Sequence, residues 1–423
     1  MPKIYILDVT NRDGVQTSRL GLAKLEKTLI NLYLNAMGIH QSELGFPYTS
    51  HEMNYIRANL ELARRGVLAP IILSGWCPIR RQEIERSFAR TGIEHVSLSI
   101  STSRQMTDGK FAGRVVRAPE ENPSVPNLID MMVESVALAK KLGAKSIGVN
   151  AEDASRTEDE YLHRFARTAK EAGADRFRYC DTLGYDDPLT IYPRIRALAE
   201  AVQIPIELHC HNDLGMAVAS SVAGAKAALD AGVDAYINTA INGMGERSGN
   251  ADLVSVILAV KKASGMAGKY VLDEKVDLSK AWKLAKYASY AFGVPIPINQ
   301  VGVGANAFAH ESGIHADGAL KDRRNYELYD FEELGRGEPE IIETGRQITV
   351  GEYSGIKGFR DVYGRLEIEF HSDREAKEIL ELARFANVHT QKPLVEDELL
   401  FIARHPDLAR QIMTMTPLAD MDD

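Results

Sequence analysis

Short runs of β-branched and apolar residues recur along the chain, and each is followed by a polar cluster and then by apolar positions at helical spacing. This alternation is typical of parallel strands joined by helices. Eight runs fit the pattern, and intervening segments such as 158–173 and 217–232 have the helical period. The predicted strands are 4–9, 39–45, 71–76, 95–101, 146–152, 178–182, 206–211 and 235–241.

Eight strand-helix units in about 265 residues have the size of a closed barrel. An open, doubly wound sheet also alternates strands with helices, but it normally carries a glycine-rich phosphate-binding turn after its first strand. Here the first strand is followed by Asn11-Arg12-Asp13-Gly14-Val15-Gln16, a cluster of charges and amides. We therefore expect an α/β protein with a (β/α)8 TIM barrel, whose chemistry lies at the carboxyl ends of the strands.

The alternation stops after about residue 268. A helical stretch at 278–292 is followed by a connection rich in proline and glycine at 294–304, and the end of the chain is amphipathic and helical. We predict C-terminal helical linker subdomains that pack against the barrel or a second subunit. The expected division is a catalytic barrel at 1–268, a linker subdomain at 269–358 and a C-terminal helical segment at 359–423.

Composition narrows the class of protein. The net charge of −9 and the mixing of basic with acidic residues argue against nucleic acid as a partner. Three well-separated cysteines without a CxxC pair favour a reducing compartment, which indicates the cytoplasm. The N-terminus lacks the pattern of an export signal, and no apolar run is long enough to cross a membrane, so no membrane role is expected.

Two histidines at the end of the seventh predicted strand carry the strongest chemical signal. Because side chains alternate along a strand, His209 and His211 lie on one face and point into the barrel mouth. Such a pair is often structural, but its position here favours a divalent metal, with Asp13 as the third ligand. Asn250, in a glycine-rich loop after the eighth strand, is predicted to complete the metal environment.

Further polar residues surround the same mouth. Arg12 either holds an enolate or alkoxide oxygen or forms a salt bridge at the rim. Gln16 and Glu43 extend the polar wall. Strand alternation also places Arg178 on one face with Thr182, where a buried guanidinium requires an anion, either Glu152 or a substrate carboxylate. The predicted substrate-binding residues are Gln16, Glu43, Asn150, Arg178 and Thr182.

Together these residues resemble the family of 2-isopropylmalate, homocitrate and re-face citrate synthases, which are metal-dependent acyl-CoA-condensing barrels. The resemblance covers most of the chain, to about residue 358, and is nearest to the homocitrate and re-face citrate synthases. It rests on three motifs in the family's order, which are Arg12-Asp13-Gly14-x-Gln16, His209-x-His211-Asn212-Asp213-x-Gly215 and Asn242-Gly243-x-Gly245-Glu246-Arg247-x-Gly249-Asn250.

The resemblance implies that Asp13, His209 and His211 bind a catalytic divalent ion (Mn, Mg, Zn or Co), that Arg12 stabilises enolate charge, and that Thr182 contacts a substrate carboxylate. It also implies a homodimer, because the segment from Gly313 to Gly318 resembles one that the family inserts into the neighbouring subunit's active site. Within and beyond that segment, His315 and Tyr326 would then handle protons together with Glu152.

The chain departs from the lysine-pathway homocitrate synthases, which resemble one another in a histidine on strand three and an arginine on strand five. Gly75 and Gly148 stand there instead. We expect Arg178 or Asn150 to hold the distal carboxylate of a dicarboxylic 2-oxo acid, with oxaloacetate ahead of 2-oxoglutarate.

The predicted enzyme is thus an acyltransferase that condenses acetyl-CoA with such an oxo acid and then hydrolyses the thioester. The alternatives are a 2-isopropylmalate or citramalate synthase, a metal-dependent acyl-CoA lyase or aldolase on the same barrel, and a catalytically inactive barrel that serves as a binding module.

Overall fold

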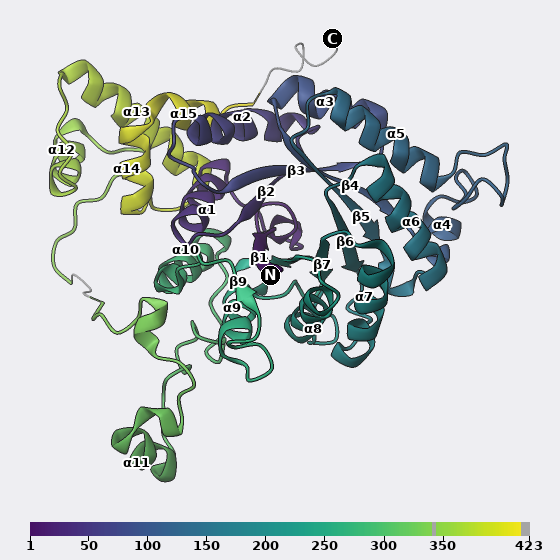
Figure 1. The fold of residues 1–423 in the computed structure, drawn as a ribbon. Coiled ribbons are helices and arrows are strands. Elements are labelled where there is room, and N and C mark those ends of the chain that lie inside the picture. Colours follow the sequence, from purple (N-terminus) through teal and green to yellow (C-terminus); the bar gives the residue numbers. More distant parts are fainter. Residues whose placement is uncertain (341–343, 416–423) are drawn as a thin grey trace.

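The computed structural model describes residues 1–340 and 344–415, and its centre is a closed barrel of eight parallel strands (Figure 1). Each of the eight strands pairs with the next along the chain, and pairing of Leu7 with Asn238 and of Asp8 with Thr239 closes the ring between the first strand and the eighth. The strands are β1 (Lys3–Asp8), β2 (Gln41–Gly45), β3 (Ile72–Pro78), β4 (His95–Ser101), β5 (Ser146–Glu152), β6 (Arg176–Asp181), β7 (Ile206–Cys210) and β8 (Ala235–Thr239), with the short β9 (Val271–Leu272) beside β1.

Helices between the strands form the outer layer of the barrel. The predicted (β/α)8 fold is confirmed, and strand ends differ from the predicted ones by a few residues. The sixth strand begins two residues earlier, at Arg176, which pairs with Gly148 of the fifth strand and whose side chain contacts Glu207 inside the barrel. The helices are α1 (Lys24–Ala36), α2 (Ser50–Arg64), α3 (Arg81–Thr91), α4 (Arg104–Lys110), α5 (Leu128–Lys141), α6 (Asp159–Ala172), α7 (Pro188–Val202), α8 (Ala217–Asp230) and α9 (Leu253–Lys262).

Local sequence explains where these elements start and how closely they pack. Asp187 caps α7 by accepting hydrogen bonds from the backbone N–H groups of Leu189 and Thr190, and Pro188 occupies the first turn, where no donor is needed. Gly224 of α8 faces Leu208 of β7, and a Cβ there would lie 2.8 Å from the leucine Cδ1. Leu208 and Cys210 therefore belong to the apolar layer under the helices, as alternation predicts.

The remaining helices lie outside the barrel. The last three pack against α1 and α2, whereas α11 stands apart from the barrel on a long excursion of the chain (Figure 1). None of the helices described is long and apolar enough to span a bilayer. These outer helices are α10 (Ala281–Phe292), α11 (Gly313–Lys321), α12 (Ile356–Arg365), α13 (Asp373–Thr390), α14 (Glu396–Arg404) and α15 (Pro406–Ile412).

The predicted domain division remains a prediction. Residue 268 lies after α9, and α12 runs across residue 358.

Candidate metal and substrate site

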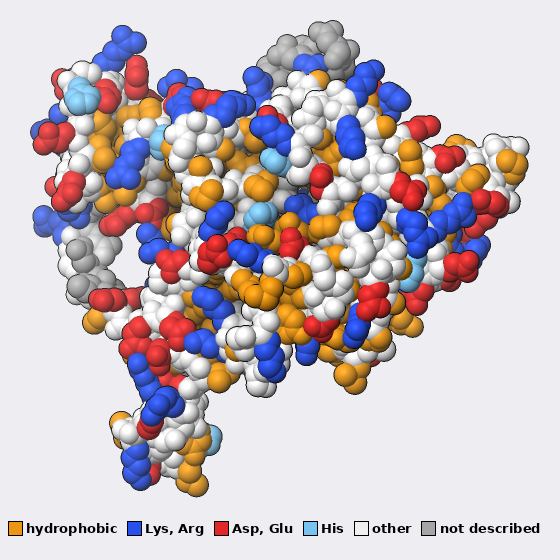
Figure 2. All heavy atoms as spheres, in the orientation of Figure 1, with side chains coloured by type: hydrophobic (Ala, Val, Ile, Leu, Met, Phe, Trp, Pro, Cys, Tyr) orange, Lys and Arg blue, Asp and Glu red, His pale blue; other side chains and the backbone are white. Residues whose placement is uncertain are grey.

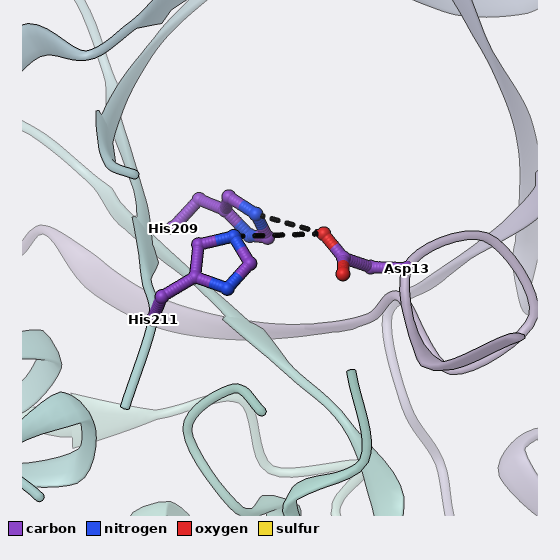
Figure 3. Close-up of side chains that lie close together, drawn as sticks. All are labelled: Asp13, His209 and His211. Atoms are coloured by element: carbon purple, nitrogen blue, oxygen red, sulfur yellow. Dashed lines mark ion pairs between the residues drawn. The ribbon is translucent and has the colours of Figure 1, made fainter. Parts of the chain in front are cut away.

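The three predicted metal ligands meet at the carboxyl ends of β1 and β7 (Figure 3). Asp13 lies in a tight turn after β1, where its N–H donates to the carbonyl of Val9. Its Oδ2 atom is 3.2 Å from Nε2 of His209 and 3.8 Å from Nε2 of His211. All three side chains are buried, and their candidate ligand atoms lie within 4.8 Å of one another. The sequence prediction that these residues come together is therefore confirmed.

The protonation states of this cluster suit a divalent cation. Burial lowers the pKa of His211 to about 3 and also lowers that of His209, so both imidazoles are neutral at physiological pH. Burial alone would raise the pKa of the Asp13 carboxyl, but Arg12 and His209 outweigh it and hold that pKa well below its usual value. The Oδ1 atom of Asp13 is buried without a hydrogen-bond partner. Two neutral imidazoles and an ionised carboxylate with a free oxygen form a donor set that fits such an ion.

Asn250 lies next to this cluster, since a backbone bridge joins it to His211. Its amide nitrogen donates to the carbonyl of Met244, and its Oδ1 atom is buried without a partner. A carbonyl oxygen of this kind is an acceptable ligand for a hard cation. Its role as a ligand stays a prediction.

A network of alternating charges lies beneath the cluster inside the barrel. Arg12 donates to Asp13 at 2.7 Å and to Glu43 at 2.9 Å. Glu43 also accepts from Arg178, whose Nε atom donates to Glu207 at 2.6 Å. These guanidinium groups outweigh burial and hold the pKa of Glu43 below its usual value. Because each buried charge has partners of opposite sign, loss of one member would leave others uncompensated.

This network corrects the predicted partner of Arg178. Its carboxylate partners within the chain are Glu43 and Glu207, not Glu152, and its contact with a substrate carboxylate stays a prediction. The reason is the closed barrel, which brings side chains of β2 and β6 together across its interior. Sequence alternation along one strand carries no information about such contacts.

A cavity of about 220 Å³ opens above the network. Eight of the predicted site residues line it, whereas Glu43, Asn150 and Asn250 do not belong to its lining. Asn150 is buried in the barrel wall, and both polar atoms of its side chain lack a partner. The lining residues are Arg12, Asp13, Gln16, Phe46, Trp76, Ser99, Lys110, Glu152, Arg178, Cys180, Thr182, His209, His211, Glu246 and Arg247.

Sequence reasoning missed several of these residues. Trp76 and Ser99 lie on predicted strands, and the strand period could have placed them beside the mouth. Lys110 belongs to α4, nine positions beyond the end of β4, and no local pattern marks it. It reaches the cavity and donates to both carboxylate oxygens of Glu152, at 2.8 and 3.1 Å.

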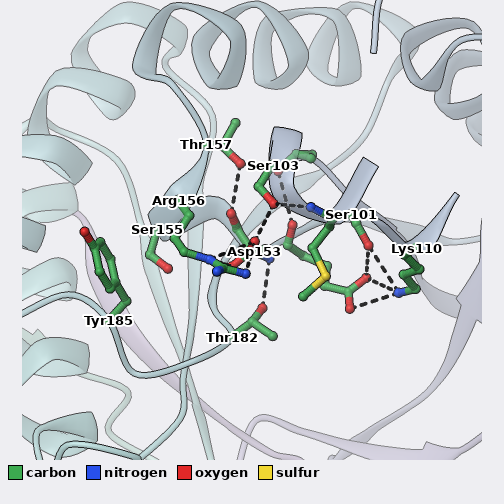
Figure 4. Close-up of polar contacts among 12 residues, drawn as sticks. Ser101, Ser103, Lys110, Asp153, Ser155, Arg156, Thr157, Thr182 and Tyr185 are labelled. Carbon is green, nitrogen blue, oxygen red and sulfur yellow. Dashed lines mark hydrogen bonds and ion pairs between the residues drawn. The ribbon is translucent and has the colours of Figure 1, made fainter. Parts of the chain in front are cut away.

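Thr182 is set to act as a donor in the cavity. Its Oγ1 atom accepts a hydrogen bond of 2.8 Å from the backbone N–H of Asp153 (Figure 4). With this lone pair engaged, the hydroxyl proton remains available for an acceptor in the cavity. A substrate carboxylate is such an acceptor.

His315 and Tyr326 do not line the cavity of their own chain. Their rings stack with centroids 4.3 Å apart, on a segment where α11 has no buried residue. This segment projects from the body of the molecule, with hydrophobic and basic side chains on its visible face (Figure 2). In the described structure the pair is therefore outside the cavity, and its catalytic role stays a prediction.

Two family models match different parts of the chain. Residues 3–287 match the model of the HMGL-like family, and residues 303–390 match that of the homocitrate synthase post-HMGL domain-like family. Among solved structures, the HMG-CoA lyase of Pseudomonas aeruginosa superposes with a TM-score of 0.54 at 14% identity, covering 70% of this chain and 95% of that chain. This structural likeness supports the barrel fold alone.

Curated relatives match nearly the whole chain. Citrate (Re)-synthase of Dehalococcoides mccartyi (strain CBDB1) is 58% identical over 99% of both chains. Homocitrate synthase 1 of Nostoc sp. (strain PCC 7120) is 33% identical over 96% of this chain and 98% of its own. 2-Isopropylmalate synthase 2 of Caldanaerobacter subterraneus subsp. tengcongensis is 38% identical over 94% of each. The chain therefore belongs to the HMGL-like family, among its citrate, homocitrate and 2-isopropylmalate synthases.

Proposed function

We propose that this acyltransferase condenses acetyl-CoA with oxaloacetate at the Re face of the ketone, and that hydrolysis of the thioester then releases citrate. The observation that carries this choice is the 58% identity, over 99% of both chains, with a citrate (Re)-synthase. The second candidate is condensation with 2-oxoglutarate to give homocitrate, since a homocitrate synthase is 33% identical over 96% of the chain.

The chemistry needs a polarised ketone and a stabilised enolate, because the methyl group of a thioester is a very weak acid. Asp13, His209 and His211 would hold a divalent ion, and an ion bound there supplies Lewis acidity toward the ketone. Arg12 lies beside them in the cavity wall. Glu43 and Asp13 fix its guanidinium, so it is already oriented toward developing negative charge.

Proton transfer is assigned to groups on the other side of the cavity. Glu152 lines it and is held by Lys110 and Ser101, so its carboxylate has a defined position for taking a proton from the acetyl methyl group. Thr182 and Gln16 would contact substrate carboxylates or carbonyl oxygens. His315 and Tyr326 of a second copy would complete the site in a cytoplasmic homodimer.

A panel of 2-oxo acids tests the proposal. The purified protein with added manganese is mixed with acetyl-CoA and oxaloacetate, 2-oxoglutarate, pyruvate or 2-oxoisovalerate, and release of free thiol is followed. Oxaloacetate should react fastest. A preference for 2-oxoisovalerate would instead indicate a 2-isopropylmalate synthase, and activity only on hydroxyacyl-CoA substrates would indicate a lyase.

The face of attack is tested separately. Citrate is made from methyl-labelled acetyl-CoA and cleaved by a citrate lyase that removes the arm added by Si-face synthases. Re-face attack leaves the label in oxaloacetate. Label in the released acetate would contradict this part of the proposal.

A further inference from the structure

The cavity has two chemically different ends. The candidate metal ligands and Arg12 come from β1 and β7, which flank β8 in the ring of strands. Trp76, Ser99 and Glu152 come from β3, β4 and β5, on the opposite side of the ring. The keto group of a 2-oxo acid must lie near the candidate metal ligands and Arg12, beside β1 and β7. The opposite end of the substrate molecule therefore points toward β3, β4 and β5.

The wall at that far end carries no cation from the strands themselves. Gly75 of β3 is packed against Pro47, and a Cβ at this position would lie 2.6 Å from the proline Cγ. Gly148 of β5 also lacks a side chain, and β4 contributes the hydroxyl of Ser99. A negatively charged end of the substrate therefore needs a cation supplied from outside the barrel wall.

Four side chains of Lys or Arg line the cavity in the described chain, and three of them each face two carboxylates. Arg12 faces Asp13 and Glu43, and Arg178 faces Glu43 and Glu207. Arg247 lies within 4 Å of both Asp213 and Glu246. Lys110 differs, because Glu152 is its single carboxylate partner among the described residues.

Lys110 also has the freedom to change partners. Its side chain is 50% exposed, whereas those of Arg12 and Arg178 are 7% and 1% exposed. Its ammonium group contacts Ser101 at 3.2 Å in addition to Glu152 (Figure 4). Because Ser101 donates to Glu152 independently, the glutamate keeps a partner when the lysine turns toward a ligand.

We propose that Lys110 binds the distal carboxylate of the 2-oxo acid and makes the site selective for dicarboxylic substrates. This inference rests on the proposed function. It assigns the binding of the distal carboxylate to a residue of α4, because β3, β4 and β5 provide no cation at that end of the cavity. Lys110 acts as a specificity-determining residue that forms a charge-assisted hydrogen bond to the end of the substrate remote from the reaction. It thereby favours dicarboxylic oxo acids over those with an apolar end, which offer the ammonium group no acceptor in place of Glu152.

A rival role for Lys110 is to position Glu152 alone. In that case its loss would slow the reaction equally for every oxo acid, because Glu152 serves the acetyl group that all of them share. Selectivity between substrates therefore separates the two roles, whereas a simple loss of activity does not.

Binding provides the first test. Malate and 2-hydroxybutanoate are unreactive and differ in whether the far end is a carboxylate or a methyl group. Calorimetry with the full-length protein and added manganese should show that Lys110→Ala weakens malate binding by about tenfold to a hundredfold. Binding of 2-hydroxybutanoate should not change. Lys145→Ala is the matched control, since this exposed lysine also pairs with one glutamate, Glu94, but lies outside the cavity.

Kinetics provides the second test. Lys110→Ala should lower kcat/KM for oxaloacetate relative to 2-oxobutanoate, largely through KM. Equal losses for both oxo acids, or malate binding equal to that of the wild type, would overturn the inference. If the wild-type protein turned over no oxo acid, the proposed function would fail, while the malate comparison would still decide the role of Lys110.

Discussion

The carboxylate of Asp13 has two polar neighbours, Arg12 and His209. Oδ2 accepts from Arg12 at 2.7 Å and lies 3.2 Å from His209, while Oδ1 remains unpartnered. The guanidinium keeps the carboxyl ionised in a buried place, and the free oxygen leaves a position for a cation. Arg12 thus faces the cavity and also maintains the charge of a candidate metal ligand.

Metal binding should depend on the imidazoles directly. We expect His211→Ala to reduce bound manganese strongly, because the site loses one of its three candidate donors. Metal analysis after gel filtration measures this, with the exposed His371→Ala as the control. Full metal occupancy in the His211 variant would show that the cluster is not the site.

Removal of the Arg12 side chain should slow turnover about a hundredfold, which corresponds to roughly 3 kcal/mol of transition-state stabilisation. The variants are Arg12→Ala and Arg12→Lys, compared by steady-state kinetics at saturating substrates after circular dichroism has verified folding. The lysine variant should retain more activity, since it keeps the charge but not the two fixed hydrogen bonds. Near-normal turnover of the alanine variant would refute the role.

At the scale of elements, the C-terminal helices are attached to α10 partly through a buried acid. Glu398 of α14 is 1% exposed and accepts a hydrogen bond of 2.8 Å from the hydroxyl of Tyr287 on α10. Burial raises the pKa of this carboxyl to about 7. The folded state therefore holds a proton that the unfolded chain, with an ordinary glutamate pKa near 4.3, releases earlier.

This difference predicts a pH dependence of stability. A raised pKa contributes stability at low pH, and the contribution is lost as pH rises through about 7. The melting temperature of the wild type should therefore fall relative to that of Glu398→Gln between about pH 5 and pH 8.

The exposed Glu396→Gln, in the first turn of the same helix, is the control for removal of one carboxylate from α14. A difference between Glu398→Gln and the wild type that did not change with pH would contradict the assignment.

At the scale of the whole molecule, the site and the projecting segment are separated within one chain. His315 and Tyr326 stack on each other away from the cavity, whereas Asp13 lies inside the barrel. If a second copy supplies the pair, each active site combines residues from two chains.

Mixing two inactive variants tests this combination. Asp13→Asn and His315→Ala should each be nearly inactive, but heterodimers contain one site with both residues intact. After subunit exchange, an equimolar mixture should recover about a quarter of wild-type activity, because half of random dimers are mixed and each has one complete site. Activity no higher than that of the separate variants would show that the residues do not meet across an interface.

The sequence by itself determined the barrel, because hydrophobic periodicity and the carboxyl-end polar clusters are local properties of each strand-helix unit. It also pointed to His209 and His211 as candidate metal ligands, since strand alternation gives the direction of a side chain without knowledge of the fold, and to Asp13 through its position just after the first strand. The resemblance to family motifs then related these residues to one another as parts of one predicted site.

Only the tertiary structure decided the contacts across the barrel. Arg178 is paired with Glu43 from β2 and Glu207 from β7, and Lys110 enters the cavity from α4. Such contacts depend on ring closure and on the path of a connecting segment, which no periodicity along one strand encodes. These pairings decide which charged groups can reach a substrate, so the proposed selectivity depends on the fold, whereas the candidate metal ligands follow from the sequence.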